Sequence, residues 1–122
     1  MSSSKRIPFL RQRAFERQDG RCFYCAVAMW LTSPCELAGC SGNRATYARL
    51  RCTAEHLIPR SEGGADNEEN IVAACAHCNA TRHKRKRPPA PAEYREDVVR
   101  RVKRGAWHQR WVHERGLVGV SK

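Results

Sequence analysis

Residues 52–83 read CTAEHLIPRSEGGADNEENIVAACAHCNATRH. This short stretch holds a Glu-His pair, a Gly-Gly turn, three asparagines and two cysteines in CxxC spacing. A segment that only has to fold rarely needs so many polar side chains of the metal-ligand type so close together. The stretch therefore predicts a functional site, and the flanking sequence indicates how that site is built.

The same stretch has the local pattern of two strands followed by a helix. Residues 49–58 alternate in character and predict a strand, whereas residues 59–67 carry the Gly-Gly and Asp-Asn signals of a turn-rich loop. Residues 71–74 predict the return strand. A helix is expected from Asn79 onward.

Four polar side chains on this scaffold are candidates for chemistry. Glu55 and His56 end the first strand, so their side chains are expected to point to opposite faces. Asn79 and His83 are four residues apart on the expected helix and share one face. Glu55, Asn79 and His83 can then converge on one hard divalent cation, with His56 beside it. An imidazole next to such a cation predicts metal-assisted hydrolysis of a phosphodiester.

Two CxxC pairs predict a metal site of another kind. The pairs are Cys22 with Cys25 and Cys75 with Cys78. Four thiolates suit a tetrahedral zinc ion and leave no open coordination position, so the ion is expected to be structural. The alternatives are four unrelated cysteines or a redox-active CxxC.

Three further cysteines, Cys35, Cys40 and Cys52, lack this knuckle spacing. One interpretation is a second zinc site completed by a histidine. The other, which the spacing favours, is that they are buried apolar residues in an insert.

The order of these elements resembles the HNH nuclease family. The matching elements are Cys22-x-x-Cys25, Glu55-His56-Leu57-Ile58-Pro59, Gly63-Gly64, Asn70-Ile71 and Cys75-x-x-Cys78-Asn79. The resemblance covers residues 21–83 and implies a ββα-metal fold, in which two strands and a helix surround one metal ion. Two features depart from the family pattern. Glu55 replaces the commoner Asp, which lengthens the reach by one methylene, and the segment between Cys25 and Cys52 is longer than in the shortest members.

The resemblance also implies a role for each site residue. His56 is expected to be the general base, and Glu55 and Asn79 are expected to be metal ligands. Asn70 is expected to order the loop between the strands by hydrogen bonds to the backbone. His83 falls where some relatives carry a further histidine ligand. The implied catalytic ion is Mg²⁺, Mn²⁺ or Ni²⁺, and the implied products carry 3′-hydroxyl and 5′-phosphate ends.

The chain is strongly basic, with a formal net charge of +11 over 122 residues. Residues 82–122 hold 13 of the 23 Lys and Arg residues but 4 of the 12 Asp and Glu residues. This excess predicts a polyanionic partner, with double-stranded DNA as the expected one. A solvated face or a flexible tail is the alternative. The expected phosphate contacts are Arg60, Arg82, Lys84, Arg85, Lys86 and Arg87.

Length and composition predict one small α+β domain. Residues 1–20 are expected to form an arm, disordered to residue 7, and a helix over residues 8–18. Residues 21–87 are expected to form the nuclease domain with its structural zinc. Residues 88–122 are expected to add a basic helix, over residues 92–113, and a loose tail to the same domain.

No apolar run reaches the roughly 20 residues of a membrane span, and the N-terminus lacks the apolar core of a signal peptide. A cytoplasmic protein without a membrane partner is therefore expected, and cysteines in that compartment are commonly metal ligands, buried small apolar residues or reactive thiols.

Two kinds of function fit these observations. The first is a metal-dependent DNA endonuclease. The second is a non-catalytic, zinc-stabilised nucleic-acid-binding module, which explains the basic half and the cysteine pairs but not the spacing of Glu55, His56 and Asn79. An RNA-cutting nuclease of the same fold is a further alternative.

Overall fold

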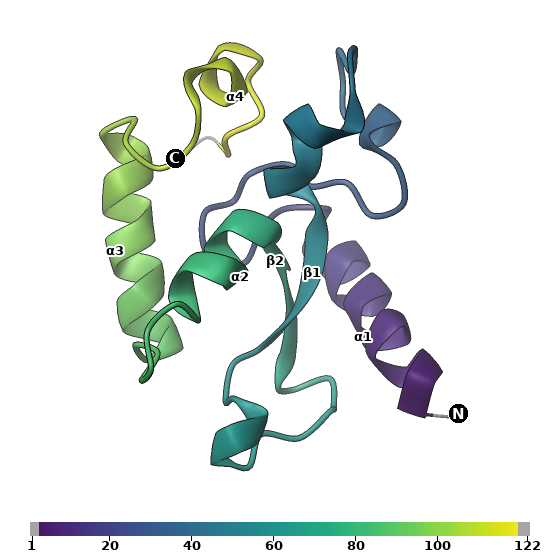
Figure 1. The fold of residues 1–122 in the computed structure, drawn as a ribbon, viewed down its shortest axis with the longest axis vertical. Coiled ribbons are helices and arrows are strands. Elements are labelled where there is room, and N and C mark those ends of the chain that lie inside the picture. Colours follow the sequence, from purple (N-terminus) through teal and green to yellow (C-terminus); the bar gives the residue numbers. More distant parts are fainter. Residues whose placement is uncertain (1–2, 120–122) are drawn as a thin grey trace.

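The computed structural model describes residues 3–119, which form a two-stranded antiparallel sheet surrounded by helices (Figure 1). The α-helices are α1 (Ser3–Arg17), α2 (Ala76–Arg82), α3 (Pro91–Lys103) and α4 (Arg110–Glu114). The strands are β1 (Cys52–His56) and β2 (Ile71–Cys75), and short 3-10 helices cover Pro34–Glu36, Arg44–Leu50 and Arg60–Glu62. The predicted small α+β class is thereby confirmed. Within residues 3–119, no helix has the length and apolar character that crossing a membrane requires.

The β-hairpin holds the centre of the molecule. The two strands pair antiparallel, with Cys52 opposite Cys75 and His56 opposite Ile71. Every residue of β2 is buried, because α1 and α2 both pack against the hairpin, and Figure 1 shows them on opposite sides of it. β1 has only one partner strand, and on its other edge the carbonyls of Ala54 and His56 accept hydrogen bonds from side chains of α2.

The first helix begins earlier than the sequence pattern predicts. Disorder was expected to residue 7, but α1 starts at Ser3 and carries Pro8 inside it. Residues 1 and 2 lie outside the described part of the chain. Leu10 and Ala14 are buried against the hairpin, and this packing stabilises the helix as a whole, including the turn that precedes the proline.

The predicted first strand is shorter than expected, because Arg44–Leu50 forms a 3-10 helix instead. The side chain of Asn43 caps this helix by accepting a hydrogen bond from the backbone of Thr46. Tyr47 and Leu50 are buried, so a helical turn places both in the core where an extended segment would expose one of them.

The predicted single helix over residues 92–113 is two helices. α3 ends at Lys103, and Gly105 follows with a φ of 70°. Its amide donates to Val102, and the amide of Ala106 donates to Arg101, which is the pattern of a Schellman helix end. The chain then turns before α4.

The tail after α4 is packed rather than loose as far as the structure describes it. Leu117 is buried, and its carbonyl accepts a hydrogen bond from the backbone of Ala28. The core thus combines residues from α1, the hairpin, α3 and the segment after α4. The three predicted parts, residues 1–20, 21–87 and 88–122, all contribute residues to this one core. The boundaries at residues 20 and 87 therefore stay a prediction.

Candidate functional site

The four predicted zinc ligands lie together in the core. The sulfur atoms of Cys22, Cys25, Cys75 and Cys78 are all within 4.8 Å of one another, and all four residues are buried. Cys25 Sγ lies 3.8 Å from Cys75 Sγ. Zinc–sulfur bonds of about 2.3 Å in a tetrahedron place the sulfurs about 3.8 Å apart, so the cluster has the dimensions of a zinc site.

Each of the four sulfurs contacts a backbone amide or a side-chain nitrogen in addition to the other sulfurs. Cys22 Sγ accepts from the amides of Tyr24 and Cys75, at 3.4 and 3.3 Å. Cys75 Sγ accepts from the amide of Cys78 at 3.4 Å. N–H groups directed at sulfur stabilise thiolate charge, which is the form that binds a metal ion.

Two side chains that the sequence interpretation did not assign to the site complete this shell. Trp107 Nε1 donates to Cys78 Sγ at 3.3 Å, and His108 Nε2 lies 3.1 Å from Cys25 Sγ. Both residues are in the turn between α3 and α4, a segment that the sequence pattern predicts as part of one helix over residues 92–113. Burial lowers the pKa of His108 to about 4, so its ring is neutral at pH 7, and its Nε2 would donate to Cys25 Sγ when that sulfur is the thiolate that binds a metal ion.

The thiols have perturbed acidities. Burial opposes ionisation of Cys22, but hydrogen bonds from Cys25, Cys75 and Cys78 outweigh it and hold its pKa well below the ordinary value. Burial and the neighbouring sulfurs raise the pKa values of Cys25 and Cys78. Metal binding releases such protons, because only thiolates are ligands.

The remaining cysteines do not build a second metal centre in residues 3–119. Cys52 is fully buried and behaves as an apolar core residue. Cys35 is exposed, and its sulfur lies 3.7 Å from that of Cys40. Among the described residues, no third histidine, cysteine or carboxylate ligand joins this pair.

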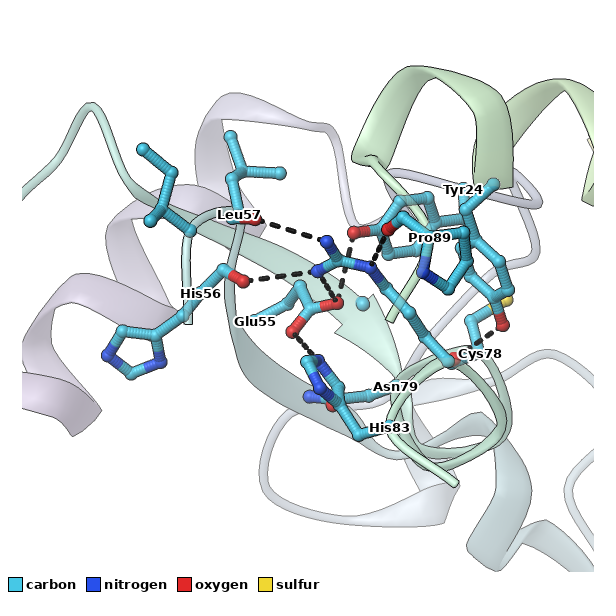
Figure 2. A network of polar contacts seen from close by, with 12 residues as sticks. Tyr24, Glu55, His56, Leu57, Cys78, Asn79, His83 and Pro89 are labelled. Atoms are coloured by element: carbon cyan, nitrogen blue, oxygen red, sulfur yellow. Dashed lines mark hydrogen bonds and ion pairs between the residues drawn. The ribbon is translucent and has the colours of Figure 1, made fainter. Parts of the chain in front are cut away.

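A second group of polar side chains lies where β1 meets α2. An open hollow of about 360 Å³ is lined by Ala54, Glu55, His56, Pro59, Arg60, Asn79 and His83. The sequence interpretation expected four of these, Glu55, His56, Asn79 and His83, to meet at one place. Figure 2 shows Glu55, Asn79 and His83 side by side, with the ring of His56 pointing away from the Glu55 carboxylate.

Glu55 is the most constrained member of the group. Its side chain is 2 % exposed, and both carboxylate oxygens have partners. Tyr24 donates its hydroxyl to Oε2 at 2.9 Å. His83 Nε2 lies 2.8 Å from Oε1. Burial and the Glu55 charge raise the pKa of Tyr24, so the phenol stays protonated and donates.

Asn79 is fixed by its amide nitrogen. Nδ2 donates to Thr53 Oγ1 at 3.0 Å and to the carbonyl of Ala54 at 3.2 Å, and both acceptors belong to β1. The nitrogen is thus committed to the strand, and the oxygen is the atom that Asn79 can offer to a cation. The donor types in the hollow are then a carboxylate, an amide oxygen and an imidazole, which is a set that divalent cations accept.

The distance between two of these donors also suits one shared ion. Glu55 Oε1 and His83 Nε2 are 2.8 Å apart. Two ligands at about 2.1 Å from one cation and at right angles to each other lie about 3 Å apart. The residues present therefore fit a divalent ion.

His56 has a partner that the sequence interpretation missed. His56 Nε2 lies 2.8 Å from Asp66 Oδ1, and Arg60 binds the same carboxylate through Nε and Nη2. The hydrogen bond from His56 and the Arg60 charge hold the pKa of Asp66 below its ordinary value. Asp66 has the sequence signature of a turn residue, and its place ten positions after His56 in the same loop is the only local signal for the contact.

Asn70 ties the two ends of that loop together. Its Oδ1 accepts from the amide of Ile58 at 2.8 Å, and its Nδ2 donates to the carbonyls of Ile58 and Ala65, both at 3.0 Å. Leu57 donates its amide to the Asn70 carbonyl. These bonds fix the backbone directly after His56.

The predicted phosphate contacts divide into two groups. Arg60 and the run Lys84, Arg85, Lys86 and Arg87 are exposed next to the hollow or just beyond α2. Arg82 is different, because its side chain is only 2 % exposed and donates to protein acceptors. The structure therefore does not place Arg82 where it can contact a phosphate, which corrects that expectation.

A comparison with protein-family models finds the HNH endonuclease family at residues 35–85. This match confirms the resemblance predicted from the sequence, and it covers β1, β2 and α2. It begins after Cys22 and Cys25, so the structure is what brings the first CxxC pair to the second. No curated protein and no solved structure matches the chain. The HNH match indicates a nuclease or nucleic-acid-binding role.

Proposed function

We propose that this protein is a metal-dependent endonuclease of the HNH type that hydrolyses DNA phosphodiester bonds. One observation carries the proposal: within the segment that matches the family, Glu55, His56, Asn79 and His83 line a single open hollow. A binding module has no need of a carboxylate, an amide and two imidazoles at one place beside a basic surface.

The proposed site divides the work among its residues in a ββα-metal arrangement of β1, β2 and α2. Glu55 Oε1, the amide oxygen of Asn79 and His83 Nε2 would hold a divalent ion such as Mg²⁺, Mn²⁺ or Ni²⁺. When bound, this ion supplies charge neutralisation at the scissile phosphate and at the leaving oxygen.

His56 is the proposed general base. Asp66 accepts a hydrogen bond from Nε2, so Nδ1 is the nitrogen that takes the proton from the attacking water. Asn70 holds the backbone after His56 and thereby the position of the ring. In-line attack of that water yields the 3′-hydroxyl and 5′-phosphate ends expected of the family.

The four-cysteine cluster has a structural role in this proposal. A zinc ion there joins the first CxxC turn to the start of α2, and α2 carries Asn79. The site residues and the zinc ligands thus share one short helix. Reduced thiols are needed for such a site, which suits the expected cytoplasmic location.

The substrate proposal rests on charge. Arg60 lines the hollow, the exposed run from Lys84 to Arg87 follows His83 in the chain, and no acidic residue interrupts this run. Such groups bind the phosphate backbone and position it without reading bases. Double-stranded DNA is the proposed substrate, because a folded basic surface matches its charge density.

The decisive experiment is cleavage of supercoiled plasmid by the zinc-loaded protein with a panel of divalent ions, beside a single-stranded RNA substrate. The wild type is expected to nick DNA with at least one ion. The His56→Ala variant should bind the plasmid as the wild type does but leave it uncut. Binding without cutting under every ion would favour the non-catalytic module, and cutting of RNA alone would favour an RNA nuclease.

A further inference from the structure

Arg82 is a charged side chain that is as fully enclosed at the site as its partner Glu55. Its side chain is 2 % exposed, and its guanidinium donates to four acceptors in two segments of the chain, residues 55–57 and Pro89. Nη1 bonds Glu55 Oε2 at 3.1 Å and the carbonyl of His56 at 3.2 Å. Nη2 bonds the carbonyl of Leu57 at 3.2 Å, and Nε bonds the carbonyl of Pro89 at 3.0 Å.

This arrangement decides which oxygen of Glu55 is available. Oε2 accepts from both Arg82 and Tyr24, so its lone pairs are used inside the protein. Oε1 faces His83, which lines the hollow. The carboxylate is therefore held in one orientation, with a single oxygen directed toward the candidate ion.

The same contact removes charge from the hollow. Glu55 carries one negative charge, and Arg82 cancels it at hydrogen-bond distance in a buried setting. Asn79 and a metal-ligating His83 are neutral ligands. Nearby, Arg60 and Asp66 form a second ion pair that is also neutral as a unit. The side chains around the hollow thus offer a divalent cation good donor atoms but no net negative charge.

We propose that Arg82 is a positioning residue that presents Glu55 Oε1 to the catalytic ion and cancels the carboxylate charge, so that the ion and a nucleic-acid phosphate bind cooperatively. The inference rests on the proposed function, since it concerns the same ion. The phosphate supplies the negative charge that Arg82 has removed. By linkage, the ion strengthens phosphate binding by the same factor.

The test measures Mn²⁺ binding by isothermal titration calorimetry with zinc-loaded protein. The His56→Ala variant is used throughout, because it should leave the DNA intact. We expect the Mn²⁺ dissociation constant to fall about tenfold or more when a short DNA duplex is present, a factor within the usual range of coupling between sites. Equal Mn²⁺ affinity with and without the duplex, within twofold, would overturn the inference.

Two substitutions of Arg82 in this background sharpen the test. Arg82→Met removes both the charge and the guanidinium contacts, so free Arg82→Met protein should bind Mn²⁺ more tightly than free Arg82→Lys protein, and the gain from DNA should shrink. Arg82→Lys keeps the charge but loses the several N–H donors of the guanidinium. Most of the gain in Mn²⁺ affinity from DNA should therefore persist, while Mn²⁺ affinity falls both with and without the duplex. An Arg82→Met protein that folds and keeps the full gain contradicts the charge argument. If Arg82→Met does not fold, the comparison of Arg82→Lys with the His56→Ala parent still tests whether Mn²⁺ and DNA bind cooperatively.

The outcomes also separate this inference from the proposed nuclease activity. Plasmid cleavage by the wild type without cooperative Mn²⁺ binding would refute the role of Arg82 and leave the nuclease proposal standing. Cooperative Mn²⁺ and DNA binding without cleavage by the wild type would refute the nuclease proposal and support the role of Arg82.

Discussion

His56 Nε2 and Asp66 Oδ1 lie 2.8 Å apart, which joins the end of β1 to the far side of the loop that follows it. A carboxylate at this distance selects one tautomer of the ring and stabilises the protonated form that a general base becomes. Arg60 donates a hydrogen bond to the other oxygen of Asp66 and so fixes the carboxylate that His56 contacts. His56 is thus oriented by a contact that the sequence pattern gave no clear reason to expect.

Asp66→Asn is therefore expected to slow DNA cleavage by about 10- to 100-fold, a part of what a general base contributes in full. The amide keeps the shape of the side chain but no longer stabilises the imidazolium. Single-turnover cleavage rates measure the effect, and Mn²⁺ affinity should stay unchanged because Asp66 is not a proposed ligand. Glu62→Gln, an exposed acid in the same loop, is the matched control. A variant at position 66 that cuts as fast as the wild type would rule this role out.

Loss of the four-cysteine site should unfold the protein. The four sulfurs are buried at the junction of the first CxxC turn, β2 and α2, and structural zinc contributes on the order of ten kcal/mol in small domains. Cys75→Ser, or removal of zinc by a chelator, should abolish the cooperative thermal transition seen by circular dichroism. Cys35→Ser should change stability by about 0.5 kcal/mol or less, because that side chain is exposed. A cooperative transition retained by Cys75→Ser would show that the core does not depend on the metal.

The N–H group of Trp107 should slow the loss of zinc. Trp107→Phe keeps an aromatic ring against the cluster but removes the donor that lies 3.3 Å from Cys78 Sγ. Removal of a group that supports a metal ligand commonly costs about 10- to 100-fold in affinity. Competition with a colorimetric chelator measures this, with Trp111→Phe as the control, since that indole donates to Gln109 instead. Equal zinc retention by the two variants would leave Trp107 a packing residue only.

Much of the hairpin and the metal clusters could be predicted because their signals are local. The two CxxC turns, the Gly-Gly loop and the strand after Asn70 each follow from a few neighbouring residues. The four cysteines then converge because the first CxxC turn bonds to β2, where the amide of Phe23 donates to the carbonyl of Ala73 and the amide of Cys75 donates to Cys22 Sγ. Spacing along the chain was enough to predict that meeting.

The missed features depend on contacts between distant segments. Arg82 reads as part of a basic run, yet it lies four residues after the buried Cys78 and so shares the inward face of α2. Its burial also requires Pro89 and the end of β1, which local patterns do not place beside it. The apolar periodicity continues across Gly105 and so hides the end of the helix there, although glycine is common just after a helix end.

Gly64 should tolerate no side chain, because the loop passes close to its own beginning there. A Cβ at this position would lie 1.7 Å from the carbonyl oxygen of Ile58 and 2.9 Å from Asn70 Nδ2. Gly64→Ala should therefore lower the unfolding temperature and the cleavage rate together. Gly63→Ala is the control in the same loop, since its φ of 88° costs about 1–2 kcal/mol but no atom lies near the new methyl. If both substitutions cost the same, the close approach at Gly64 is not what shapes the loop.

The exposed basic run after α2 should carry part of the salt dependence of DNA binding. Lys86 and Arg87 are exposed, and each phosphate contact that is lost should reduce the slope of log affinity against log salt by about 0.9. Lys86→Gln combined with Arg87→Gln should therefore flatten that slope in a fluorescence anisotropy titration. Arg110→Gln is the control, because Arg110 lies on α4, at the other end of the molecule from the loop between β1 and β2 (Figure 1). A slope that changes equally in both proteins would mean that DNA contacts the charge of the whole surface, and that the run beside the hollow does not position the scissile phosphate.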